Sequence, residues 1–425
     1  MKVARAFTKA ALLGLALLLG SWAVLGWGPV ELAEAQPREP VSIPLPAWVR
    51  SVEVLNDGAR VFRGPSEASG RRGTIARGTR LRVLRRLSGV DCPTGYWFQV
   101  GEELYLCTRH AQLSAELPTG VPQPVVPEGA ILPKAYAFVR TDGARAYART
   151  SDYFTDEYAM ALGQGFGVVV TGERVTQGVR FVRTENQLYI ERGDIGFARG
   201  SDHQGVELGP DDDLHFAWVR RDNATVHARP NGPVLRRVGR RTRLRLDPDA
   251  PARSGWLTLA DGGAMRTRDL QRPLLSAPPA EVRPGERWLD VSVAEQVLVA
   301  YEGERPLFVT LVSTGREGPH HRTPLGVHAI WIKLAYSDMS NLGVDAPSEY
   351  AIEDVPWVQY FEGSNGLHAA FWHDDFGHAR SHGCVNLSPR DARYLFDFTQ
   401  PALPAGWNAI LPLESERPSY IRVRP

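Results

Sequence analysis

Short apolar runs separated by turn residues dominate the sequence beyond residue 40. Residues 97–100 and 104–106 are two such runs on either side of a turn, and residues 288–293 alternate between apolar and polar positions. Runs of this length bounded by Gly, Asn and Asp are typical of β-strands. The clearest helical pattern begins at Ser388 and Pro389, which suit the N-cap and the first helical position. The pattern predicts a mainly β protein with one short helix.

A weak repeat organises the chain before its last third. The pattern Ala-aromatic-Val-Arg occurs at 47–50, 137–140 and 217–220, each time followed by an Asn- or Asp-containing turn and a short β-rich run. Frequent turns and short strands favour small β-barrels. We predict three modules, at residues 47–116, 134–207 (divergent) and 215–272. They resemble bacterial SH3-like domains, and a role in binding cell wall rests on that resemblance, because their aromatic residues equally suit a barrel core.

Proline-rich joints separate these modules from each other and from the C-terminal segment. Four prolines fall within 118–127 and four more within 273–284. Proline-rich linkers act as semi-rigid spacers, so the C-terminal segment is expected to be held at a distance from its attachment point. That segment, residues 286–413, has several strand patterns before the predicted helix.

The composition excludes one large class of function. The 425 residues include 49 basic and 48 acidic side chains, which leaves a formal net charge of +1. With no basic excess overall, nucleic-acid binding is not expected. Apolar residues make up 43% and charged residues 23%, as in globular proteins.

The N-terminus reads as an export signal. Lys2, Arg5 and Lys9 precede the uncharged, mostly apolar run 10–27, and Ala33-Glu34-Ala35 fits a small-x-small cleavage site. We therefore predict a signal peptide at 1–35 and a location in the periplasm or cell wall. The apolar run is long enough that an uncleaved membrane anchor is the alternative.

The three cysteines divide into a pair and a single residue. Cys92 and Cys107 bracket a predicted hairpin, and export places them in an oxidising compartment. We predict a disulfide between them, with a loop-closure effect of roughly 3 kcal/mol. Cys384 is left without a partner, which marks it as a candidate reactive thiol.

The segment Ser381-His382-Gly383-Cys384-Val385-Asn386 carries the most specific chemistry. A catalytic cysteine needs a base and donors for an oxyanion. His368 lies sixteen residues upstream and reaches Cys384 if the two segments are neighbouring strands. Gly383 leaves the backbone uncovered, so nearby N–H groups are free to converge on a substrate carbonyl.

Gly366-Leu367-His368 followed by Ser381 to Asn386 resembles the signature of the L,D-transpeptidase (YkuD) family. Further elements match at 313–315, 323–326 and Lys333, and the resemblance covers roughly 286–413. It implies a YkuD-like β-sandwich and a two-step acyl transfer on peptidoglycan stem tetrapeptides. Cys384 would then be the nucleophile and His368 its base, oriented only by the backbone carbonyl of Ala369.

Six other residues complete the predicted site. The resemblance implies that the backbone N–H groups of His382, Gly383 and Cys384 hold the oxyanion, while Ser381 and Asn386 fix the loop by hydrogen bonds. Tyr360, Trp372 and Asn386 are predicted to line the substrate pocket, although aromatic residues in a β domain are as often core. The His382 side chain is expected to be structural.

Three alternatives stay open. The same site with water as acceptor would be a carboxypeptidase or endopeptidase. A zinc site is conceivable because His368, His373, His378, His382 and Cys384 are potential ligands, but H-E-x-x-H and cysteine pairs with metal spacing are missing there. The third alternative is a non-catalytic wall-binding scaffold. We expect no cofactor and no metal, and stem peptides as partners, with a wall-linked protein as another acceptor and membrane contact only through an uncleaved signal.

Overall fold

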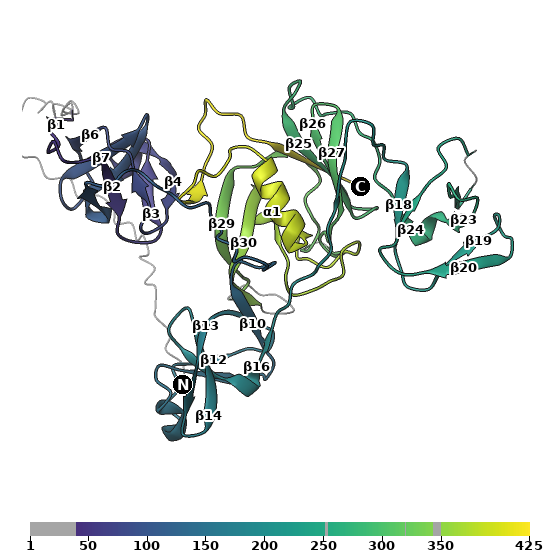
Figure 1. The fold of residues 1–425 in the computed structure, drawn as a ribbon, viewed down its shortest axis with the longest axis horizontal. Coiled ribbons are helices and arrows are strands. Elements are labelled where there is room, and N and C mark those ends of the chain that lie inside the picture. Colours follow the sequence, from purple (N-terminus) through teal and green to yellow (C-terminus); the bar gives the residue numbers. More distant parts are fainter. Residues whose placement is uncertain (1–39, 251–253, 319, 343–349) are drawn as a thin grey trace, which may run out of the picture. The chain divides into compact units, whose positions relative to one another are not determined.

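The computed structural model describes residues 40–250, 254–318, 320–342 and 350–425 (Figure 1). The predicted signal peptide lies outside the described residues. Strands dominate, and α1 (Pro389–Phe398) is the single α-helix of the described ranges, as the sequence pattern predicted. Ser388 caps it by accepting a hydrogen bond from the Asp391 N–H (3.2 Å), and Pro389 occupies its first turn. No helix among the described residues is long and apolar enough to cross a membrane.

The first predicted module is a set of short strands around one apolar core. Val52, Val61, Phe98 and Leu106 are buried in that core. Its strands are β1 (Ser42–Ile43), β2 (Ser51–Val54), β3 (Ala59–Phe62), β4 (Arg71–Ile75), β5 (Arg80–Leu81), β6 (Arg85–Ser88), β7 (Tyr96–Gly101), β8 (Leu104–Cys107) and β9 (Ala111–Ser114).

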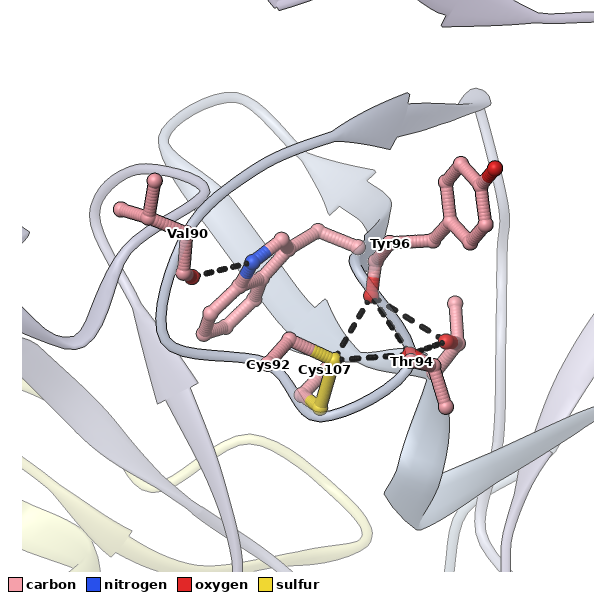
Figure 2. Close-up of a disulfide and its surroundings, with 7 residues drawn as sticks. Val90, Cys92, Thr94, Tyr96 and Cys107 are labelled. Carbon is pink, nitrogen blue, oxygen red and sulfur yellow. Dashed lines mark hydrogen bonds between the residues drawn. A yellow bond between two sulfur atoms is a disulfide. The ribbon is translucent and has the colours of Figure 1, made fainter.

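A disulfide joins Cys92 to Cys107 at the end of the β7–β8 hairpin (Figure 2). Cys92 Sγ accepts a hydrogen bond from the Thr94 hydroxyl (3.0 Å), and the nearby Trp97 indole donates to the Val90 carbonyl (3.0 Å). The cross-link fixes the loop that leads into β7. Cys384 is the free cysteine of the chain.

The second module has its own core, which includes Val139, Val182 and Ile190. Its strands are β10 (Ala135–Val139), β11 (Ala144–Tyr147), β12 (Met160–Leu162), β13 (Gly167–Thr176), β14 (Val179–Thr184), β15 (Tyr189–Glu191) and β16 (Ile195–Phe197). β17 (Val206–Glu207), at the end of the predicted range, pairs with the C-terminal domain instead.

The third module is built on two small sheets around Val219, Val226 and Met265. One sheet has the order β21-β18-β24 and the other β20-β19-β23-β22. The strands are β18 (Phe216–Val219), β19 (Ala224–His227), β20 (Val234–Val238), β21 (Arg243–Arg245), β22 (Trp256–Thr258), β23 (Ala264–Arg266) and β24 (Leu270–Gln271). The barrel identity of the modules stays a prediction.

The C-terminal domain packs two layers of strands and α1 around a shared core. The first layer has the order β17-β27-β26-β25-β34-β28. The second contains β29, β30, β31, β32 and β33. Their bounds are β25 (Arg287–Ser292), β26 (Val297–Glu302), β27 (Arg305–Leu311), β28 (Gly326–Ala329), β29 (Ile332–Ser340), β30 (Ala351–Glu362), β31 (Asn365–Ala369), β32 (Val385–Leu387), β33 (Trp407–Ile410) and β34 (Tyr420–Arg424).

The first layer is buried on both faces. Leu289, Val291 and Leu298 face the core shared with α1 and β30 to β32, whereas Trp288 and Val299 face a second cluster that contains residues of the third module. Five of the six residues of β25 are therefore buried, although alternation of apolar and polar residues is typical of a strand with one solvent-exposed face.

Two expectations about the organisation were wrong. β34 pairs in parallel with β25, from Trp288 opposite Tyr420 onward, so the domain continues beyond the predicted end at residue 413. The proline-rich joint after the first module also does not hold the C-terminal domain at a distance. It contacts that domain directly, because the Gly406 N–H donates to the Val121 carbonyl (2.8 Å). β4 pairs with β33 and β13 with β30, so two modules join the sheet of the C-terminal domain.

Candidate active site

The predicted base lies on one of two parallel strands, and the predicted nucleophile directly precedes the other. β31 pairs with β32 so that Leu367 lies opposite Val385 and His368 opposite Asn386. Leu367 and Val385 point into the core, so the alternation of side chains turns His368 and Asn386 to the other face. Cys384 is two residues before Asn386, which places its side chain on that same face. The strand register is compatible with the predicted pairing of Cys384 and His368, which stays a prediction.

His368 is almost fully buried and has a defined tautomer. Its Nδ1 lies 3.0 Å from the Ala369 carbonyl, and because a carbonyl only accepts, Nδ1 carries the proton. Nε2 is then the basic nitrogen. Burial lowers the pKa of His368 to about 4, although the Ala369 hydrogen bond opposes this. The imidazole is therefore neutral at pH 7 and able to accept a proton.

Cys384 is a half-buried thiol held by backbone groups. Its Sγ lies 3.7 Å from the Ser364 carbonyl. Desolvation raises the pKa of Cys384, and the Gly366 N–H counteracts only part of that effect. Both directions of pKa shift favour the neutral forms, a Cys384 thiol and a His368 imidazole, over a thiolate and an imidazolium.

The turn before Cys384 is closed by Ser381. Its hydroxyl donates to the Cys384 carbonyl (2.5 Å) and accepts from the Gly383 N–H (3.0 Å). Gly383 has φ 130°, and a Cβ there would lie 2.2 Å from Asn365 Oδ1, so the position requires glycine. The expected oxyanion role of the Gly383 N–H is contradicted, because that donor already serves Ser381.

The His382 side chain is a structural element of the rim. Arg316 Nη2 donates to His382 Nε2 (2.6 Å), and the His382 ring stacks on Tyr350 with centroids 5.2 Å apart. Burial first, and then the positive charge of Arg316, lower the pKa of His382. Its accepting nitrogen is thus occupied, so His382 is not free to take a proton.

Aromatic residues surround the pair. Trp372 packs against His368, with ring centroids 5.7 Å apart. The pKa values of Tyr350 and Tyr360 are raised, mainly by burial and also by proximity to Cys384. Sequence reasoning missed Tyr350, because only the β29–β30 pairing carries it back to the site.

Asn386 is a second polar residue on the face of the β31–β32 pair that carries His368. It is almost fully buried, and its Nδ2 lies 3.0 Å from His373 Nε2. Its Oδ1 has no hydrogen-bond partner within the described part of the chain. A buried acceptor without a donor is costly, so the Asn386 side chain is held in place mainly by its contact with His373.

The geometry does not gather the histidines as metal ligands. Residues 40–250, 254–318, 320–342 and 350–425 contain no group of three or more His, Cys, Asp or Glu side chains that could hold a metal ion. His368, His373 and His382 each direct a ring nitrogen to a separate protein partner. The zinc interpretation has no support in these contacts.

The third module holds the loop behind His368. Arg240 Nη1 donates to Asp375 Oδ1 (2.9 Å), and Arg241 Nη1 donates to Asp374 Oδ1 (2.7 Å). Gln271 donates to the Gly377 carbonyl (2.5 Å). We name residues 372–378, which these contacts hold and which include Trp372, the catalytic-face loop.

Residues 286–405 match the family model of the YkuD L,D-transpeptidase catalytic domain. The chain therefore contains a catalytic domain of the L,D-transpeptidase type, in the part of the chain that carries Cys384 and His368. No curated protein sequence matches the chain.

Solved structures of L,D-transpeptidases are among the matches. An Enterococcus faecium L,D-transpeptidase is 19% identical, with 33% of this chain and 50% of that chain covered and a TM-score of 0.26. A Mycobacterium smegmatis L,D-transpeptidase is 16% identical, with coverages of 60% and 93% and a TM-score of 0.27. Mycobacterium tuberculosis L,D-transpeptidase 1 is 21% identical, with coverages of 33% and 61% and a TM-score of 0.23. The chain spans half the length of the Enterococcus chain. TM-scores of 0.23 to 0.27 are too low for a conclusion to be drawn from these similarities.

Proposed function

We propose that this protein is an exported L,D-transpeptidase that cross-links peptidoglycan through a Cys384 acyl-enzyme. The observation that supports the proposal is the register of β31 and β32, in which His368, with its basic Nε2, lies opposite Asn386, two residues after Cys384. The match of residues 286–405 to the catalytic-domain family supplies the substrate class. An enzyme of this class acts outside the cytoplasm, in agreement with the expected signal peptide.

In the first step Cys384 attacks the carbonyl between an L-centre and the terminal D-residue of a stem tetrapeptide. The C–S bond forms while the thiol proton moves to His368 Nε2. The amide C–N bond then breaks, and the departing amine takes that proton from the imidazolium. A thioester and a free D-amino acid result.

In the second step an amine of another stem peptide attacks the thioester. Its proton passes to His368, the C–S bond breaks, and the proton returns to the Cys384 sulfur. The new amide is the cross-link. Because the low pKa of His368 makes its imidazolium a strong acid, the base readily gives back each proton that it takes.

The surrounding groups have distinct proposed tasks. The backbone N–H groups of His382 and Cys384 stabilise the oxyanion, since that of Gly383 is engaged. Tyr360 and Trp372 form walls that limit the entry of water. Asn386, which lies opposite His368 in the strand pair, helps to shape the substrate pocket.

The test is mass spectrometry of disaccharide-tetrapeptides incubated with the protein of residues 36–425. The matched control is its Cys384→Ala variant. Cross-linked dimers formed only by the intact protein would support transfer. Trimmed tripeptides without dimers would establish hydrolysis instead, and no change with either protein would favour the scaffold alternative.

A further inference from the structure

The third module concentrates positive charge in a chain that is almost neutral overall. Residues 215–272 contain thirteen arginines, five aspartates and no lysine or glutamate, whereas the whole chain has a net charge of +1. The rest of the chain is therefore acidic on balance. Such an asymmetry marks a segment whose partner is an anion.

Strand register places two of these arginines in one row across a sheet. Arg237 on β20 lies opposite Thr225 on β19, and Arg266 on β23 lies opposite Trp256 on β22. His227 lies opposite Ala264, so Thr225, two residues earlier, comes opposite Arg266. The row therefore runs Arg237, Thr225, Arg266, Trp256 across all four strands.

This row lies on the side of the sheet that faces away from the module's core. The neighbouring positions Ala224, Val226 and Met265 point inward and are buried in that core. Side chains alternate along a strand, so the arginine row points outward. We call the surface formed by Arg237 and Arg266, with the buried Trp256 ring against Arg266, the arginine face.

The arginines of this face lack acidic partners. Among the residues that the structure describes, no carboxylate lies within ion-pair distance of Arg237 or Arg266. Arg237 donates only to the Asn223 carbonyl (3.2 Å).

Arg266 is set for a planar anion. Its guanidinium lies 4.6 Å from the centre of the Trp256 ring, and Arg266 donates to Asn231 Oδ1 at 3.5 Å. A guanidinium stacked on an aromatic ring is pre-organised, and its edge matches a carboxylate in bidentate geometry.

Several other arginines of the module have acidic partners. Arg236 pairs with Asp261 (2.6 Å) and Arg245 with Asp213 (3.0 Å). Arg240 and Arg241 hold the catalytic-face loop. Arg220, Arg243, Arg268 and Arg272 also have no carboxylate within ion-pair distance among the described residues, but none of them lies on a strand of the four-stranded sheet that carries the arginine face.

We infer that the arginine face binds the free carboxylates of peptidoglycan stem peptides and so anchors the enzyme on the polymer that it cross-links. The inference rests on the proposed function, because that function supplies a carboxylate-bearing polymer outside the cytoplasm. Each stem tetrapeptide ends in a carboxylate, and a polymer presents many of them to several arginines at once. Screening by salt weakens an attachment of this kind.

The test measures binding of the residue 36–425 protein with Cys384→Ala to insoluble peptidoglycan stripped of wall-linked phosphate polymers. The combined variant Arg237→Gln and Arg266→Gln is expected to bind roughly tenfold more weakly, because two exposed charge contacts are lost. The control, Arg236→Gln with Arg245→Gln, removes the same charge from arginines that are already paired and is expected to bind as the parent does. Thermal melts show whether all three proteins are folded.

A second arm of the experiment uses peptidoglycan whose carboxyl groups have been amidated. This amidation is expected to abolish binding. Equal binding by the parent and the Arg237/Arg266 variant would overturn the inference. So would binding that survives amidation, or binding that requires the phosphate polymers. Because Cys384→Ala removes turnover, failure of the cross-linking proposal would appear in the muropeptide assay and not in this one.

Discussion

At the scale of single residues, the environment of His368 defines what kind of base it is. Its Nδ1 proton is committed to the Ala369 carbonyl, and burial suppresses the charged form. A base of this kind is neutral over the whole physiological range. It depends on the substrate to bring the thiol, the imidazole and the carbonyl into line.

The pH profile follows from that environment. We expect kcat/KM to rise as the pH increases through about 4, because a protonated His368 cannot accept the Cys384 proton, and then to stay level through neutrality. Steady-state rates between pH 3.5 and 8 measure this. A control variant, His215→Gln in the exposed part of the third module, is expected to keep the same profile. An acidic limb centred at pH 6.5 or above would refute the assignment.

At the residue level, the sequence says most where the chemistry is local in the chain. The spacing of His368 and the Ser381 to Asn386 segment was enough to choose the candidate pair. It was not enough to show that the Ser381 hydroxyl takes the Gly383 N–H, because that bond depends on the turn geometry. Tyr350 carried no recognisable signal in its local sequence.

At the scale of elements, the C-terminus of α1 is closed by a buried lysine. Lys333 is fully buried on β29, and its Nζ donates to the carbonyls of Phe396 (2.6 Å) and Thr399 (2.9 Å). Desolvation lowers the pKa of Lys333 to about 7. The lysine supplies donors for carbonyls that a helix end leaves unpaired.

Replacing this lysine tests how much the cap matters. Lys333→Met leaves two buried carbonyls without donors, so the free energy of unfolding is expected to fall by about 2–4 kcal/mol. Chemical denaturation gives the value. Arg393→Met, on the exposed side of the same helix, is the matched control and is expected to change stability by less than about 0.5 kcal/mol. Equal stabilities for the two variants would show that the lysine is not a cap.

The catalytic-face loop is the element through which the third module reaches the active site. Arg241→Gln removes the hydrogen bonds to Asp374, and we expect kcat to fall severalfold because Trp372 no longer holds His368 in place. KM is expected to change less. The reversed pair Arg241→Asp with Asp374→Arg is expected to recover part of kcat.

Arg243→Gln, on β21 of the same module, is the control for lost charge in this experiment. An unchanged kcat in Arg241→Gln, or a loss that the reversed pair does not relieve, would mean that the contact has no positioning role.

At the scale of the whole molecule, the histidines and one aspartate set the acid stability. Burial lowers the pKa values of His203, His368 and His373 to about 4, so these residues take up protons on unfolding between about pH 4 and 6.5. Burial raises the pKa of Asp391 to about 6, so it loses a proton on unfolding in part of that window. Among these four groups, three proton uptakes against one release make the stability rise with pH.

We therefore expect the free energy of unfolding to decrease as the pH falls from about 6 to 4. Each net proton contributes a slope of up to about 1.4 kcal/mol per pH unit. Urea unfolding at several pH values between 4 and 7 measures the slope. Stability that is constant or increases on acidification in this range would contradict these burial effects.

The modular architecture was only partly predictable at this scale. Strand patterns and the repeat gave the segments, since they reflect local alternation and turns. The predicted spacers failed because pairings such as Gly73 with Ile410 and Gly167 with Ile352 join residues far apart in the chain. The pairing of β34 with β25 also joins distant parts of the chain. The local sequence pattern therefore did not reveal it, and the predicted domain ended at residue 413.

The most direct test of the account is intact-mass and peptide analysis of the residue 36–425 protein, quenched with acid during turnover of a stem tetrapeptide. The account predicts an adduct equal in mass to the acyl part of the tetrapeptide without its terminal D-residue, located on Cys384 and missing from Cys384→Ala. An adduct on another residue, or turnover that persists in Cys384→Ala, would contradict it.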